Sequence, residues 1–117
     1  MSESDKYQLP HRFNCYEYVS RDVLEERYLF ITRVFLDKNT GRMCDFHIQL
    51  SDKYTHQLLV SADCEHQVAH YHDERRGHRN SPRYDFAPAS THSEIEKACG
   101  RVMDEILEFC RRKGIIL

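Results

Sequence analysis

Histidine is concentrated in one stretch of this chain, where four of its eight histidines fall within the segment 66–78. These four are His66, His70, His72 and His78. If residues 66–72 are extended, a side-chain period of two places His66, His70 and His72 on one face of a strand. Neighbours on such a face lie roughly 7 Å apart, so His70 and His72 are spaced to flank a small anion such as a substrate phosphate.

Two imidazoles at this spacing suit acid–base chemistry on RNA. Histidine titrates near neutral pH, and two close rings disfavour simultaneous protonation, so one serves as the base while the other remains an acid. In metal-free RNA cleavage the base takes the 2′-hydroxyl proton and the acid protonates the leaving 5′-oxygen. We therefore predict a ribonuclease without a cofactor, with His70 and His72 as the catalytic pair and His66 assisting them.

Arginines follow the histidine-rich stretch directly. Guanidinium groups bind phosphate oxygens through two parallel hydrogen bonds, so we predict that these arginines bind the phosphates of RNA. Acidic residues are interleaved with them and offset part of the positive charge. The predicted phosphate-binding residues are Arg75, Arg76, Arg79 and Arg83, and the neighbouring acids are Asp73, Glu74 and Asp85.

Two other interpretations of this segment remain open. Cys64, His66, His70 and His72 are competent zinc ligands, and ligands two apart on a strand can share an ion, although the chain has no CxxC or HExxH motif. Alternatively, the histidine and arginine face is a surface that binds a protein partner. The chain would then be a non-catalytic interaction or inhibitory module.

The flanking sequence predicts strands that would position these side chains. Residues 28–36 are rich in aromatic and β-branched residues, and residues 43–50 alternate apolar and polar side chains. Residues 56–64 place Leu58, Val60 and Ala62 on one face, residues 66–74 form a fourth strand, and residues 83–86 are a short fifth. The pattern predicts an antiparallel meander of four to five strands over residues 28–86.

One helix is predicted after the strands, over residues 92–113. Its apolar residues recur at three- and four-residue spacing, Thr91 and Glu94 have capping-box spacing, and Gly114 supplies a stop. Gly100 interrupts the helix and suggests a close approach to the sheet. The apolar residues are Ile95, Ala98, Cys99, Val102, Met103, Ile106, Leu107 and Cys110. The fold class is therefore α+β, with the meander packed against one C-terminal amphipathic helix.

Length and composition fit one globular domain over residues 1–117, with 40% hydrophobic residues and a net charge of −2. Residues 1–14 are polar and are predicted to be an extended arm, and residues 21–27 are predicted to be a helical turn or a loop. We find no signal peptide and no apolar stretch of membrane-spanning length, so the prediction is a cytoplasmic protein without membrane contact. Among the five dispersed cysteines, Cys44, Cys99 and Cys110 lie at apolar positions and are predicted to be small core residues.

The order of elements and the segment SADCEHQVAHYHDERRGH resemble the TumE-like toxins of toxin–antitoxin modules. The resemblance covers about residues 28–110 and depends mainly on Asp63, His66, His70 and His72. It implies a toxin-like or RNA-directed role. It also implies a cognate antitoxin, often a DNA-binding protein, as a partner that neutralises the histidine-rich strand.

Overall fold

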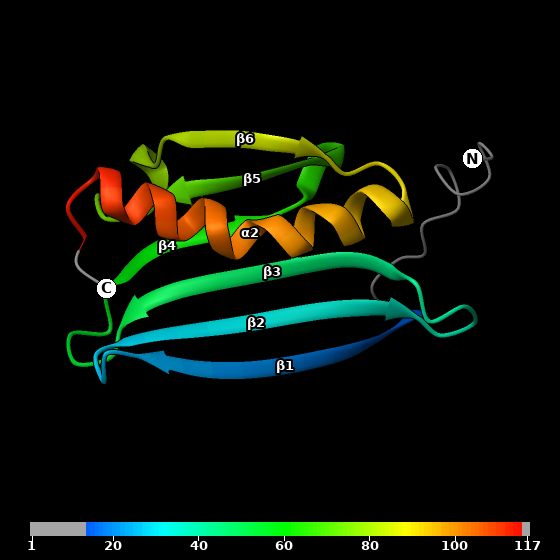
Figure 1. Cartoon of the computed structure of the whole chain (residues 1–117), viewed down its shortest axis with the longest axis horizontal. Coiled ribbons are helices and arrows are strands. Elements are labelled where there is room, and N and C mark those ends of the chain that lie inside the picture. The colour runs from blue at the N-terminus through cyan, green and yellow to red at the C-terminus, as the bar shows by residue number, and fades with distance from the viewer. Residues whose placement is uncertain (1–13, 116–117) are drawn as a thin grey trace.

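The computed structural model describes residues 14–115 as a single six-stranded antiparallel sheet with one long helix (Figure 1). Each strand pairs with the next one along the chain, so the sheet order is the chain order. The strands are β1 (Cys15–Leu24), β2 (Tyr28–Asp37), β3 (Met43–Asp52), β4 (Leu58–Asp63), β5 (Val68–Asp73) and β6 (Arg83–Pro88). The meander topology and the α+β class predicted from the sequence are confirmed.

Helix α2 (His92–Arg112) covers one face of the sheet, where it packs on β3, β5 and β6. Strands β1 and β2 lie beyond the helix (Figure 1). The core between helix and sheet contains large side chains that are almost fully buried, among them Phe30, Phe46, Ile48, Ile106 and Phe109. The opposite face of the sheet, which we call the open face, carries no α-helix among residues 14–115.

The predicted helix is confirmed to within one residue at its C-terminal end. The Glu94 backbone N–H donates to Thr91 Oγ1 at 3.1 Å, which satisfies one of the exposed donors of the first turn. The inference about Gly100 is wrong, because this residue is exposed and a Cβ added there would meet nothing within 4 Å. Gly100 therefore faces solvent and brings no part of the helix closer to the sheet.

The sheet is larger than predicted, with six strands over 15–88 instead of four to five over 28–86. The residues predicted to form a helical turn or loop, 21–27, instead continue β1 as far as Leu24 and then turn. Leu and Glu favour helices locally, but β1 pairs with β2 along its whole length from Cys15 to Leu24. Pairing across the sheet thus overrides the weak local preference.

Strand β4 begins at Leu58, and its register shifts at once. Ser51 pairs with Leu58, whereas Leu50 pairs with Val60, so one extra residue enters the strand between them. Leu59, Val60 and Ala62 belong to the core, whereas Leu58 lines the open face. The predicted grouping of Leu58 with Val60 and Ala62 is therefore wrong for Leu58, because a bulge moves a side chain to the other face of the sheet.

The histidine-rich segment is only partly extended. A 3₁₀ turn, Glu65–Gln67, precedes β5, and His66 has a left-handed φ of 61°. The period of two holds from Val68 onward, because Ala69 and Tyr71 enter the core while His70 and His72 lie on the open face. The prediction of one extended segment over 66–72 is thus correct for β5 and wrong for His66.

The sequence also made predictions about three cysteines, the N-terminal arm and membrane spans. Cys44 and Cys110 are buried and Cys99 is half-buried, as expected for small core residues. The predicted arm, residues 1–14, lies outside the described residues except for Asn14. Within residues 14–115, the structure contains no helix long and apolar enough to cross a membrane.

Candidate functional site

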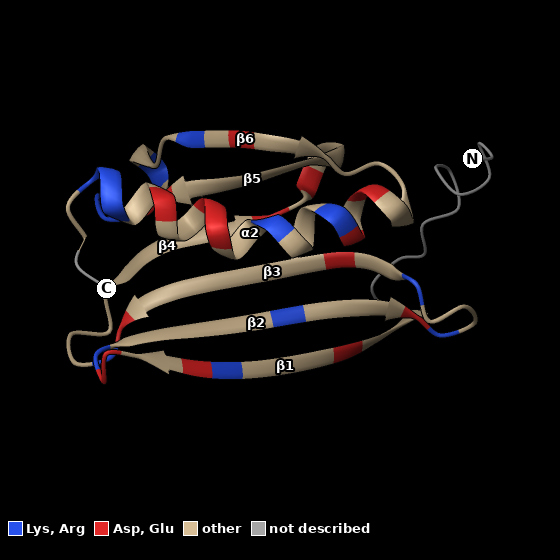
Figure 2. Cartoon of the chain, in the orientation of Figure 1, with Lys and Arg blue, Asp and Glu red and all other residues tan. Residues whose placement is uncertain are grey.

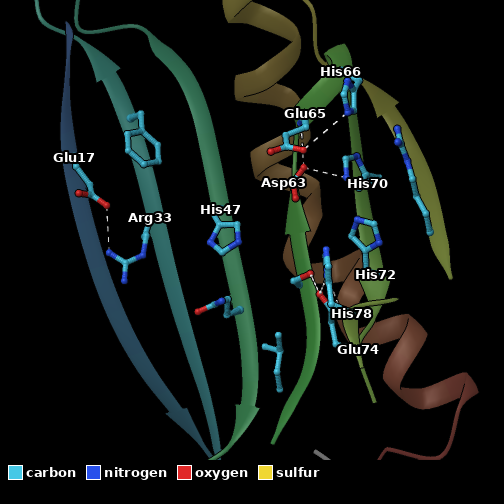
Figure 3. Close-up of a pocket in the computed structure, with 15 residues that line it drawn as sticks. Glu17, Arg33, His47, Asp63, Glu65, His66, His70, His72, Glu74 and His78 are labelled. Carbon is cyan, nitrogen blue, oxygen red and sulfur yellow. Dashed lines mark hydrogen bonds and ion pairs between the residues drawn. The ribbon is translucent and has the colours of Figure 1, made fainter. Parts of the chain in front are cut away.

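A hollow of about 730 Å³ lies on the open face of the sheet (Figure 3). Its lining is mainly polar and includes histidines, carboxylates and two arginines from several strands and from the loop after β5. The lining residues that form contacts with one another or lie in one row of the sheet are His47, Ser61, Asp63, His70, His72, Glu74 and His78.

The strand register explains why these side chains meet. Across three neighbouring strands His47 pairs with Asp63, and Asp63 pairs with His70. In the adjacent row Ser61 pairs with His72. Directly opposed residues of an antiparallel pair point to the same face, with Cβ atoms roughly 5 Å apart. A meander therefore brings residues from β3, β4 and β5 into one cluster on the open face.

His70 is held between two oxygen acceptors. Its Nδ1 lies 2.8 Å from the Val68 carbonyl oxygen, and its Nε2 lies 3.0 Å from Asp63 Oδ1. The ring is only 2% exposed, so neither nitrogen has ready access to bulk water. A carbonyl and a carboxylate both accept hydrogen bonds, so the ring satisfies both contacts when both nitrogens carry protons. His70 is thus a fixed and buried ring beside Asp63, with both of its nitrogens engaged.

His72 lies next to His70 and is less buried. The two rings meet edge to face with centroids 4.9 Å apart, and His72 Nδ1 lies 3.4 Å from Ser81 Oγ. Burial lowers the pKa of His72 below its ordinary value, and the charge of His70 lowers it further. His72 is therefore mainly neutral at pH 7 and is able to accept a proton.

Two further groups extend the cluster toward solvent. The buried Glu74 accepts a hydrogen bond from Ser61 Oγ at 2.6 Å, and both of its carboxylate oxygens lie 3.3 Å from His78 Nδ1. The His78 side chain is 83% exposed, and its ring centroid is 6.0 Å from that of His72. Glu74 thus orients His78 at the rim of the hollow (Figure 3).

His66 and Cys64, which were predicted from the sequence, do not join this cluster. His66 lies at the edge of the hollow, where its side chain is 77% exposed and its Nε2 lies 4.0 Å from Glu65 Oε2. Cys64 is buried in the core cluster, and its sulfur donates to Asp45 Oδ1 at 2.9 Å. Burial and the Asp45 carboxylate raise the pKa of the Cys64 thiol, which makes it a poor nucleophile.

The donor atoms that could share a metal ion differ from the predicted zinc ligands. Asp63, His70 and His72 each offer one ligand atom, and these atoms lie within 4.8 Å of one another. Asp63 thus belongs to this group of possible ligands, whereas the predicted ligands Cys64 and His66 do not. Two imidazoles and one carboxylate suit ions such as zinc or iron.

The predicted phosphate-binding arginines are dispersed. Arg75 forms two hydrogen bonds with Asp73 at 2.9 Å each, and Arg83 bonds Asp85 at 2.7 Å. Arg76 and Arg79 are exposed in the loop after β5, and only Arg83 of the four lines the hollow. Figure 2 shows basic and acidic positions interspersed along the ribbon.

Several central residues carried too weak a sequence signal to be predicted as site residues. Ser61 and Asp63 stand at alternate positions in an otherwise apolar strand, which is the one pattern that could have indicated a polar site on β4. Glu74 is buried despite its charge, and its role depends on Ser61 and His78, which only the folded chain brings to it.

Comparison of the chain with protein-family models, with curated proteins and with solved structures found no match. The resemblance to TumE-like toxins therefore stays a prediction. The geometry on the open face is the basis for assigning a function.

Proposed function

We propose that this protein is an RNA-directed ribonuclease that cleaves by metal-independent transesterification in the hollow of the open face. The observation that carries the proposal is the contact series from Asp63 to His70 to His72. In this series His72, whose pKa is lowered by burial, lies beside the buried His70 in a hollow open to solvent. Paired imidazoles of this kind provide proton transfer near neutral pH.

Each histidine has a distinct role in this mechanism. His72 is the base, because its lowered pKa keeps it unprotonated at pH 7. His70 is a positioning residue, since its two nitrogens are already engaged by Asp63 and Val68. With a proton on both nitrogens, its positive charge would also favour the negative phosphorane-like transition state. His78 is the acid, because its ring is exposed at the rim and oriented by Glu74.

The proposed reaction follows the order of proton transfers. His72 takes the proton of the 2′-hydroxyl, and the 2′-oxygen forms a bond to phosphorus. The bond from phosphorus to the 5′-oxygen then breaks, and His78 gives its proton to that leaving oxygen. The products are a 2′,3′-cyclic phosphate end and a free 5′-hydroxyl end.

Two arginines of the hollow are placed to contact the RNA backbone. Arg83 pairs with Asp85, and Arg33 pairs with Glu17 at 3.2 Å, and all four of these side chains are at least one-third exposed. Exposed ion pairs of this kind contribute little to stability, so a phosphate can replace the carboxylate with little loss. The other predicted phosphate contacts, Arg75, Arg76 and Arg79, would meet RNA only outside the hollow.

Incubation of the purified protein with a panel of RNAs in EDTA tests the proposal. We expect 2′,3′-cyclic phosphate ends, and we expect His72→Gln and His78→Gln each to lower the cleavage rate by about 10²- to 10⁴-fold. His56→Asn is a matched control, because His56 is exposed in the turn after β3 and its φ of 62° is tolerated by asparagine. Intact RNA across the panel would reject the metal-independent nuclease.

A second candidate function uses the same cluster as a metal site, as favoured by the spacing of Asp63, His70 and His72. In that case the activity is lost in EDTA and returns when zinc or another divalent ion is added. Metal analysis of the untagged protein gives an independent readout. Cleavage that is unchanged in EDTA supports the metal-free mechanism.

The partner implied by the TumE-like resemblance is an antitoxin, and the hollow is the surface that such a protein would cover. Co-expression with a neighbouring gene product should then give a stable complex in which the cleavage of RNA is blocked. A stable complex formed by a protein that never cleaves RNA would instead favour the non-catalytic interaction module.

A further inference from the structure

The two edges of the sheet differ in how they are protected. Strand β6 is a six-residue edge that ends in Pro88, and it follows another proline at position 82. Strand β1 is a ten-residue edge without proline or glycine. Natural sheets blunt an exposed edge with short strands, prolines and charges, because unpaired backbone groups recruit another strand. Within residues 14–115, β1 lacks the first two of these protections.

Exposed hydrophobic side chains gather on the same strand. Among the described residues, the large hydrophobic side chains that are exposed are Tyr16, Tyr18, Val19, Val23 and Tyr54, and the first four belong to β1. Tyr16 and Tyr18 are 53% and 55% exposed. Side chains of this kind gain stability when a second strand covers them.

We propose that β1 is a homodimer interface, at which it pairs antiparallel with β1 of a second copy around a two-fold axis at Val19. In this register Glu17 of one copy lies opposite Arg21 of the other, and the same pair recurs across the axis. Such a self-complementary surface is what a two-fold interface requires. The result is one continuous sheet that joins the two molecules.

The charge pattern selects this register over its neighbours. Moving the axis to Tyr18 places Arg21 opposite Cys15, and moving it to Ser20 places Arg21 opposite Val19. Of these three axes, only the one at Val19 places Glu17 opposite Arg21. It also places Tyr16 opposite Asp22 and Tyr18 opposite Ser20. Opposite charges that face each other across an antiparallel pair stabilise it, whereas like charges destabilise it.

The contacts that Glu17 and Arg21 make within one molecule do not prevent this pairing. Glu17 already accepts from Arg33 at 3.2 Å, but its side chain is 44% exposed. Arg21 is exposed and forms no ion pair with any residue in the described part of the chain. In the dimer Glu17 would lie between Arg33 of its own chain and Arg21 of the second copy.

Sedimentation analysis of the full chain at about 100 μM tests the interface, because a homodimer of micromolar affinity is well populated at that concentration. We expect a dimer. Glu17→Arg makes both residues of each facing 17–21 pair basic, and Arg21→Glu makes both acidic. Each variant alone should therefore dimerise at least about tenfold more weakly. An equimolar mixture should restore a heterodimer, because the two variants are complementary in the same register.

Glu108→Arg and Arg111→Glu are matched controls, since they make the same charge changes on the exposed face of α2 and should leave dimerisation unchanged. Circular dichroism of each variant verifies the fold, and the mixing step separates a lost interface from a damaged molecule. A monomeric wild-type protein at this concentration overturns the proposal. So does a dimer that both single variants preserve, or a mixture that fails to associate.

Discussion

The two halves of the sheet differ in what supports them. Strands β3 to β6 form the half that lies against or beside α2, and β4 and β5 consist almost entirely of buried or half-buried residues. Strand β1 is exposed along nearly all its length and, with β2, projects beyond the helix (Figure 1). The candidate histidines lie on the supported half.

The half of the sheet beside α2, strands β3 to β6, is also where polar groups are buried. His70, Ser61 and Glu74 are each less than a tenth exposed, and no buried side-chain nitrogen or oxygen in the described part of the chain lacks a hydrogen-bond partner. Buried polar groups must be satisfied in this way, and the resulting network fixes each ring in one orientation. The comparison indicates that helix packing on one face allows a rigid polar site on the other.

The largest expected contrast between the two halves is in core truncation. Phe109 is fully buried, and its ring centroid lies 5.3 Å from Tyr71 and 5.4 Å from Tyr84. Phe109→Ala should lower the free energy of unfolding by about 3–5 kcal/mol. Tyr18→Ala on β1 removes an exposed ring and should change it by about 1 kcal/mol or less. Urea unfolding at a concentration where the chain is monomeric measures both, and similar losses would erase the distinction.

A smaller contrast is expected between two carboxylates of the open face. Asp63→Ala leaves the buried Nε2 of His70 without its acceptor and should cost about 1–3 kcal/mol of stability. Glu17→Ala removes an exposed ion pair with Arg33 and should cost less than about 1 kcal/mol. Unfolding of both variants at neutral pH gives the comparison. Equal costs would mean that Asp63 does not hold His70.

The pH dependence of stability tests whether His72 lies in the environment described. Because burial and His70 lower the pKa of His72 in the folded chain, the unfolded chain binds the proton more readily. The resulting stability is fully present above the ordinary value of 6.5, and it is lost as the pH falls from 6.5 through the lower folded pKa.

His72→Gln should flatten this part of the curve. The measurement is the free energy of unfolding between about pH 5 and 7, above the range where most carboxylates titrate. An identical slope for the wild type and the variant would contradict the environment assigned to His72.

The sequence predicted the elements whose patterns are local. Helix α2 and the alternation of β3 follow from periodicity, and a helix covering a meander follows from one apolar face on each. Strand β1 could not be predicted in the same way, because eight of its ten residues are exposed and show no alternation of burial. Its structure depends on pairing with β2, which is a property of the folded sheet.

The candidate site was predicted only where the strand period applied. His70 and His72 are two apart on β5 and do share the open face. His66 does not continue that strand, because Glu65–Gln67 forms a turn in which two residues have positive φ. Asp63 contacts His70 through the register of neighbouring strands, and Glu74 contacts His78 through the loop after β5. Neither contact follows from the spacing of these residues along the chain.

The smallest expected effect concerns two glycines in open space, one on the helix and one at the end of the β2–β3 ribbon. A Cβ would meet nothing within 4 Å at either Gly100 or Gly41, so the backbone conformation decides the outcome. Gly100→Ala should raise the free energy of unfolding by up to about 1 kcal/mol, because alanine favours the helix. Gly41 has a φ of 73°, where alanine is strained, so Gly41→Ala should lower it by about 1 kcal/mol. The midpoints of thermal unfolding of the two variants should therefore shift in opposite directions. Shifts in the same direction would show that packing, not backbone conformation, controls one of these positions.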